Sequence, residues 1–65
     1  MQIAELKVNH FYTKAKKNKP VIVVWEFVGF CNHRPVFRMY TEGVASNHYS
    51  PAIESDVESM REIEY

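Results

Sequence analysis

Cysteine and histidine are the residue types in this chain that could bind a metal ion. The four candidates in 65 residues are His10, Cys31, His33 and His48. Zinc takes four such ligands in a tetrahedral arrangement, but the Cys31-x-His33 spacing is unlike that of zinc motifs, and the other two histidines fall in separate segments. Solvated loop histidines and a lone cysteine that behaves as a small apolar residue explain the pattern more simply. We therefore predict no metal site and no cofactor.

The same Cys31 and His33 could supply a thiol nucleophile and its base. An activated thiol needs a base that a third group orients, in a pocket that excludes water. A chain of 65 residues with two glycines has little room for such a cleft. The sequence therefore favours a protein that is not an enzyme.

Lysine is concentrated in the polar segment 14–19, close to the aromatic residues Phe11 and Tyr12. Lysines can neutralise phosphates while exposed aromatic rings stack on bases, a combination that suits a small nucleic-acid-binding barrel. The alternative is a solvated hairpin tip that protects a sheet edge. The candidate nucleic-acid contacts are Lys14, Lys16, Lys17, Lys19 and Arg34.

The net charge of zero conceals an asymmetry along the chain. Residues 1–40 contain seven lysine or arginine residues and two glutamates, whereas residues 51–65 contain five acidic residues and one arginine. The acidic segment would repel phosphates, which weighs against nucleic-acid binding. It could instead face a basic protein or imitate phosphates toward a DNA-binding enzyme, and a solvated charged face is the simpler alternative.

The elements that must position these residues are organised around Val21–Phe30, the most apolar stretch of the chain. Its β-branched and aromatic residues are typical of a strand, and it is too short to cross a bilayer as a helix. Alternate residues of a strand point to opposite faces, and both faces are apolar here. A C-terminal helix, a second subunit or another protein must therefore cover the outward face, which carries Ile22, Val24, Glu26, Val28 and Phe30.

Three further strands are expected at Phe11–Ala15, Arg34–Thr41 and Val44–Tyr49, the last of them at an edge of the sheet. Gly29 permits a bulge or a sharp bend near the end of the central strand. The expected connectors are 16–20, Cys31–His33 and Glu42–Gly43.

The register of the central hairpin follows from charge and size. Pairing Glu26 with Arg38 matches opposite charges on one face and gathers the large apolar side chains on the other. The remaining pairs are then Val24–Tyr40, Trp25–Met39, Phe27–Phe37, Val28–Val36 and Phe30–Arg34. The predicted core consists of Val23, Trp25, Phe27, Phe37 and Met39.

The apolar period changes near the end of the sequence. Ile53, Val57, Met60 and Ile63 recur at the spacing of one helical face. Ser55 and Glu58 have the spacing of a capping box. We therefore predict a short acidic helix at about 55–64, which could lie across the outward face of the sheet.

This order of elements resembles the short SH3-like barrels common among bacteriophage and mobile-element accessory proteins. The resemblance covers about residues 5–50 and is carried by Leu6-x-Val8-x-x-x-Tyr12, by the Lys17–Pro20 turn into Val21–Val24, and by the Arg34–Arg38 strand. The chain departs from that pattern at Asn9, where glycine is usual, and in its acidic rather than basic final segment. The resemblance implies a binding or regulatory module without catalytic residues.

The fold expected for the single domain 1–65 is therefore mainly β. It comprises a small SH3-like barrel of four or five antiparallel strands at about 5–50 and a short C-terminal α-helix. At this length one domain and one core can form, and a partner subunit would help to stabilise it.

The leading functional hypothesis is a non-enzymatic protein-binding module, a phage or mobile-element accessory factor that modulates a host protein by occlusion. The alternative is a small nucleic-acid-binding barrel that uses the segment 14–19. A homodimer is left open, and no membrane contact is expected. A single cysteine and the absence of a signal peptide at the N-terminus indicate the cytoplasm, that of the host if the protein is phage-encoded. The expected partner contacts are Val24, Arg38, Tyr40, Met60 and Tyr65.

Overall fold

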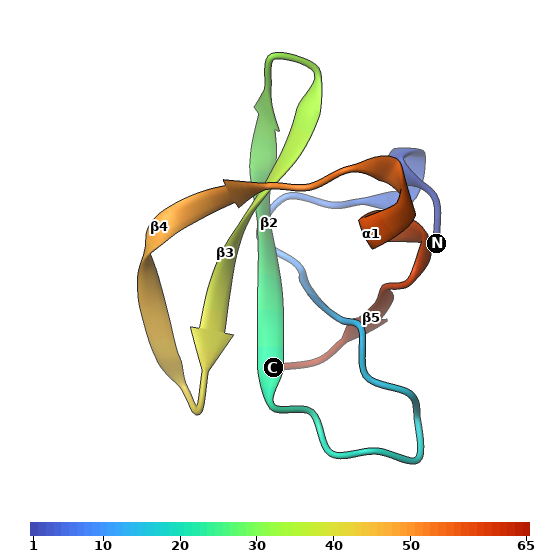
Figure 1. Ribbon diagram of the computed structural model, residues 1–65, viewed down its shortest axis with the longest axis vertical. Coiled ribbons are helices and arrows are strands. Elements are labelled where there is room, and N and C mark those ends of the chain that lie inside the picture. Colours follow the sequence, from blue (N-terminus) through green and yellow to red (C-terminus); the bar gives the residue numbers. More distant parts are fainter.

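The long apolar stretch forms the central strand of an antiparallel sheet. In the computed structural model, which describes residues 1–65, β2 (Val23–Cys31) lies between β1 (Phe11–Thr13) and β3 (Arg34–Thr41). The edges are β4 (Val44–Pro51) and β5 (Arg61–Ile63), so the strand order is β4-β3-β2-β1-β5. The sheet curls strongly, and its two edge strands do not pair with each other (Figure 1). The expected mainly β fold, with antiparallel strands and a short helix near the C-terminus, is confirmed.

Two tight turns set the hairpins on either side of β3. The backbone φ angles are 52° at Asn32 and 65° at His33, and 53° at Glu42 and 81° at Gly43. Positive φ at both central residues is the mark of a type I′ turn, whose twist matches that of the flanking strands. Both turns fall where the sequence predicted connectors.

The predicted β2–β3 register is confirmed for the inner part of the hairpin and wrong at its tip. A bulge between Phe27 and Gly29 shifts the pairing, so Gly29 faces Val36 and Phe30 faces Pro35. Gly29 has a φ of 140°, which other residues rarely adopt. The expected Val28–Val36 and Phe30–Arg34 pairs therefore do not form. The confirmed pairs are Val24–Tyr40, Trp25–Met39, Glu26–Arg38 and Phe27–Phe37.

A second irregularity interrupts the edge strand β4. Arg38 faces Tyr49 while Tyr40 faces Ala45, so residues 46–48 bulge opposite a single residue of β3. The Arg38 Nε donates a hydrogen bond to the Ser46 carbonyl oxygen at 3.0 Å and holds this bulge in place. Bulges of this kind twist an edge strand away from pairing with other chains.

The core lies on the concave face of the sheet, under the short helix. Phe27 and Phe37 are buried as predicted, and Trp25 packs against them half-buried. Val23 and Met39 are also only half-buried, because they lie toward the end of β2–β3 that no helix covers. The core cluster consists of Tyr12, Phe27, Phe37, Ala52, Val57 and Met60.

The acidic helix is shorter than predicted. It forms α1 (Glu54–Glu58), and Arg61–Ile63 then pairs with β1 as the strand β5. The helix ends because Met60 turns into the core, where it is 4% exposed, and because the free edge of β1 accepts the backbone that follows. The Asp56 carboxylate, rather than a Ser55–Glu58 box, accepts the Ile53 backbone N–H at 3.2 Å.

The helix also covers the opposite face from the one expected. The Val57 side chain is fully buried in the core, on the concave side of the sheet. The short 3-10 helix η1 (Ile3–Glu5) lies beside α1, and the Met1 amino group donates to the Glu58 carbonyl oxygen (Figure 1). Neither helical segment has the length and apolar character that a bilayer crossing requires.

Candidate functional site

The chain's own aromatic residues cover part of the outward face. The rings of Phe11, Tyr40 and Tyr65 contact one another, with centroids 5.2 to 5.9 Å apart. Rings this close leave no space for a ligand between them. Val24, which pairs with Tyr40 on this face, is only 3% exposed. The cluster is therefore a second, smaller core, formed by the C-terminal residues rather than by α1.

Glu26 and Arg38, which were predicted to match in charge on this face, bind other groups instead of each other. The Tyr40 hydroxyl donates to the Glu26 Oε1 at 2.9 Å, and this hydrogen bond raises the pKa of Tyr40 above its usual value. Arg38 binds the Ser46 carbonyl oxygen, and its guanidinium carbon lies 5.9 Å from the centre of the Tyr40 ring. Glu26 and Arg38 are cross-strand neighbours that form no ion pair with each other.

The five predicted partner contacts do not share one surface. Val24 and Met60 are 3% and 4% exposed and belong to opposite faces of the sheet, so neither can reach a partner. We therefore correct the prediction that these two residues contact a partner, because both side chains are buried. Arg38 and Tyr40 are half-buried on the outward face, and Tyr65 is 59% exposed beside them.

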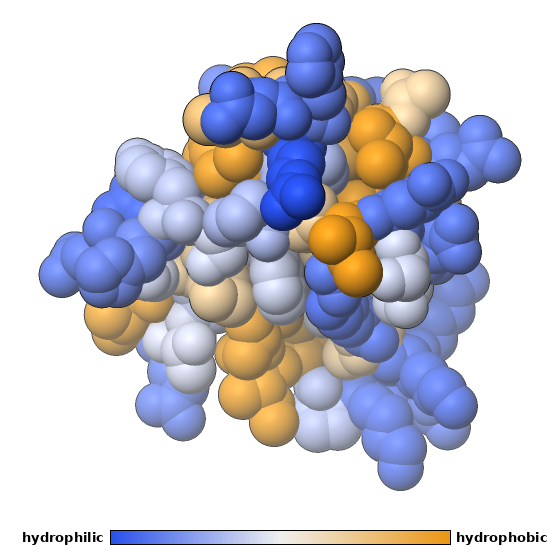
Figure 2. All heavy atoms as spheres, turned by 45° about the horizontal axis from the view of Figure 1, so that its top comes forward, coloured by the Kyte–Doolittle hydropathy of each residue, from blue (hydrophilic) through white to orange (hydrophobic).

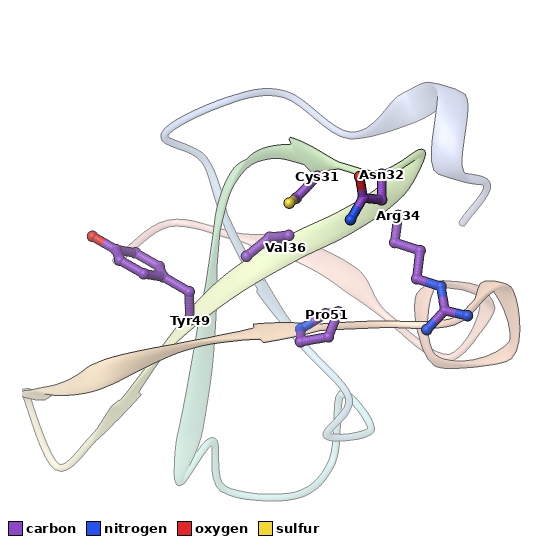
Figure 3. Close-up of a pocket in the computed structure, with 6 residues that line it drawn as sticks. All are labelled: Cys31, Asn32, Arg34, Val36, Tyr49 and Pro51. Carbon is purple, nitrogen blue, oxygen red and sulfur yellow. The ribbon is translucent and has the colours of Figure 1, made fainter.

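An open groove occupies another part of the outward face, at the tip of the β2–β3 hairpin. It consists of two hollows of about 540 and about 460 Å³ that share Cys31, Val36 and Tyr49. Figure 3 shows Val36 between the hairpin tip and β4, with the Tyr49 ring and the Arg34 guanidinium at opposite ends. We call this feature the outer groove, lined by Val28, Gly29, Phe30, Cys31, Asn32, Arg34, Val36, Tyr49 and Pro51.

Arg34 is the only charged residue that lines the outer groove. It forms no ion pair, since the ion pairs of the structure join Lys7 and His10 to Glu62 and Lys14 to Asp56. The groove therefore combines apolar walls with one free positive charge. Figure 2, which turns the hairpin end toward the viewer, shows apolar side chains reaching the surface in separate patches between hydrophilic ones.

The sequence identified part of the outer groove. Val28 and Val36 belong to the apolar patch predicted on the outward face. Tyr49 and Pro51 were missed as lining residues, because they follow the three-residue bulge of β4, whose register the sequence does not reveal. The one available signal was the aromatic Tyr49 in an otherwise small and polar strand.

The predicted nucleic-acid contacts are divided between two ends of the molecule. The lysine loop, residues 14–20, lies at the bottom of Figure 1, and the tip of the β2–β3 hairpin lies at the top. Arg34 belongs to this tip, because it pairs with Cys31 next to the turn. The five residues therefore do not form one patch. Lys14 is bound to Asp56 at 2.8 Å, and the other three loop lysines are exposed and form no ion pair.

The cysteine and histidines weighed as metal ligands do not gather at one site. His10 contacts the Glu62 carboxylate at 2.9 Å, while Cys31 is an exposed free thiol at the hairpin tip. The structure contains no group of three or more histidine, cysteine, aspartate or glutamate side chains arranged to hold a metal ion.

Comparison of the chain with protein-family models, with curated proteins and with solved structures gives no match. The residues and their geometry therefore carry the functional argument alone.

Proposed function

We propose that this protein is a non-enzymatic binding module that docks an extended segment of another protein in the outer groove. The observation that carries the proposal is an uncovered apolar groove with one free arginine, on the same face as an aromatic cluster whose rings contact one another. By occupying a segment of its partner, the module would act through steric occlusion.

Side-chain type supports a protein partner. Tyr49 is 61% exposed at the wall of the outer groove. Phe30, predicted on this face, is turned to the core face by the bulge at Gly29, where its ring packs edge-on against Phe27 with centroids 5.2 Å apart. Tyrosine and arginine are among the residues that contribute most to binding at protein interfaces. The hollows are shallow and open, which suits single side chains of a peptide better than an enclosed small molecule.

Charge determines the kind of segment that fits. Arg34 has no acidic neighbour in the groove, so a carboxylate from the partner would be its first charged contact. A guanidinium pairs with a carboxylate through two parallel hydrogen bonds. The proposed occupant therefore carries an acidic residue close to an apolar one.

The test uses a degenerate library of extended peptides with one fixed glutamate and one fixed leucine. The control library has lysine in place of the glutamate. We expect selection of binders from the acidic library only. Tyr49→Ala should weaken a selected peptide by about tenfold or more, as expected for the loss of about 1.4 kcal/mol at an interface hot spot. Val44→Ala is the matched control, because Val44 is equally exposed on β4 outside the groove.

The single cysteine gives an independent readout of the same site. Cys31 is exposed and lines the groove, so a bound peptide should slow its alkylation by iodoacetamide. Selection of both libraries alike, or alkylation at an unchanged rate with peptide bound, would overturn the proposal. Concentration-dependent protection of Cys31 without peptide, together with dimers in sedimentation, would overturn it in favour of a second copy as the occupant.

A further inference from the structure

We infer that the lysine loop and the hollow beside Trp25 form a second binding site, which takes single-stranded nucleic acid. This site lies on the concave face of the sheet, at the opposite end of the β2–β3 hairpin from the outer groove, and goes beyond the proposed docking function. The hollow has a volume of about 420 Å³, and its apolar walls are Pro20, Ile22, Val23, Trp25 and Met39.

The lysine loop is held in a defined conformation. The Lys19 N–H donates to the Lys16 carbonyl oxygen at 3.0 Å and closes a turn. The Arg61 Nε, from the neighbouring edge strand β5, donates to the Ala15 carbonyl oxygen at 3.0 Å. The Thr13 hydroxyl, in a residue that is 1% exposed, accepts the Ala15 N–H and donates to the Val23 carbonyl oxygen. These contacts hold the loop beside the hollow.

Three ammonium groups are free on this loop. Lys16, Lys17 and Lys19 are exposed, and no carboxylate of the chain pairs with them. They lie next to a hollow whose lining includes an indole ring and the exposed Ile22 side chain. Positive charge beside an apolar and aromatic surface is the combination that binds phosphates and bases of a single strand together.

The Lys14 ammonium group lies over the Trp25 ring, where a stacked base would bind. It lies 4.7 Å from the centre of the Trp25 ring and is held there by Asp56 at 2.8 Å. A stacking base would displace the ammonium group, which then becomes a fourth phosphate contact. The cost is small, because a solvent-exposed ion pair contributes little to stability.

Trp25 is the only tryptophan and reports binding directly. The probe is an oligothymidylate of about fifteen nucleotides, a length that spans one small barrel. We expect quenching of the Trp25 emission and an affinity that falls about 20-fold or more between about 50 and about 200 mM salt. This corresponds to a slope of about −2 to −3 for three or four lysines on a single strand.

Three variants separate this site from the outer groove. Lys16→Gln with Lys17→Gln should lower the salt slope by about 1.4 and leave peptide binding unchanged. Arg34→Gln should weaken the acidic peptide and leave the oligonucleotide unaffected, which keeps failure of one proposal distinct from failure of the other. Asp56→Asn should strengthen oligonucleotide binding about two- to fivefold, because it frees Lys14 while the amide can still accept the Ile53 N–H.

Two results would overturn the inference. One is oligothymidylate that leaves the Trp25 emission unchanged at low salt. The other is a glutamate homopeptide of the same length that binds as tightly and quenches as strongly, which would make the site a general anion surface. Ile22→Ser tests the hollow without endangering the fold, since Ile22 is 62% exposed, and it should weaken the oligonucleotide while the melting temperature stays the same.

Discussion

The Tyr12 side chain joins the core to the N-terminal segment through one hydrogen bond. Its ring is fully buried, edge-on to Phe37, and its hydroxyl accepts the Lys7 backbone N–H at 2.8 Å. Burial raises the pKa of Tyr12, so the hydroxyl stays neutral at physiological pH.

We expect Tyr12→Phe to lower the free energy of unfolding by about 1 kcal/mol, because the Lys7 N–H loses its acceptor while the packing is kept. Tyr12→Ala should cost about 3 to 5 kcal/mol, because it also leaves a cavity. Urea denaturation followed by Trp25 fluorescence measures both. A Tyr12→Phe variant as stable as the parent would show that solvent satisfies this N–H equally well.

Glu62 makes stability depend on pH. Its carboxylate contacts the His10 Nδ1 at 2.9 Å and the Lys7 Nζ at 3.9 Å. The hydrogen bond with His10 is the main cause that holds the pKa of Glu62 below its ordinary value. The folded-state pKa is therefore lower than the unfolded one. The resulting stabilisation is complete above the unfolded pKa and is lost as the pH falls through the folded one.

We expect His10→Ala to destabilise the protein at neutral pH and to have little effect below the carboxyl titration range. Urea midpoints at the two pH values measure this difference. Lys14→Ala is a parallel case, because the Lys14 hydrogen bond is the main cause that lowers the pKa of Asp56. A loss of stability that is the same at both pH values would assign the His10 effect to packing instead.

At the scale of the elements, the turn between β2 and β3 is one of the places where the sequence fits the backbone poorly. His33 adopts a φ of 65° in a type I′ turn, a region that side chains with a Cβ enter only at a cost. Asn-Gly is the preferred pair in such turns, and Asn32 already stands in the first position.

We expect His33→Gly to raise the free energy of unfolding by about 0.5 to 1 kcal/mol, because the relief of strain exceeds the added entropy of the unfolded chain. Urea denaturation measures the gain. His48→Gly is the control: it lies in β4, where added chain flexibility should only destabilise. If His33→Gly were also destabilising, side-chain contacts of His33 would outweigh the strain.

The sequence predicted the elements that depend on side-chain pattern and missed those that depend on backbone detail. Alternation of apolar residues and the Glu26–Arg38 match were enough to predict the inner register of the β2–β3 hairpin. The bulges at Gly29 and at 46–48 each shift the strand pairing by one or more residues. Residues at or next to these bulges line the outer groove.

The C-terminal segment shows the limit of local periodicity. Met60 and Ile63 fit a helical face by spacing, yet the first is buried after α1 ends and the second pairs with Phe11 across β5 and β1. A free strand edge far away in the sequence decided this outcome, and a local pattern contains no information about it. The pairing of β5 with β1 also brings Tyr65 against Phe11. On the same face Val24, which was predicted to contact a partner, is buried.

At the scale of the whole molecule, the two proposed sites use opposite ends of one hairpin. Val23 borders the tryptophan hollow and Cys31 borders the outer groove, and no residue lines both. Cys31 lies eight positions after Val23 along β2, a separation of at most about 26 Å at about 3.3 Å per residue. Charges at this separation are screened, because the Debye length is about 8 Å at physiological ionic strength.

We therefore expect the two ligands to bind independently and at the same time. The dissociation constant of a fluorescent acidic peptide should change less than about twofold when oligothymidylate is saturating, since a coupling free energy near zero means equal affinities. Anisotropy of the peptide measures the constant, and sedimentation should show a ternary complex. Competition between the ligands would mean either that they share a surface or that β2 and β3 change shape when one binds.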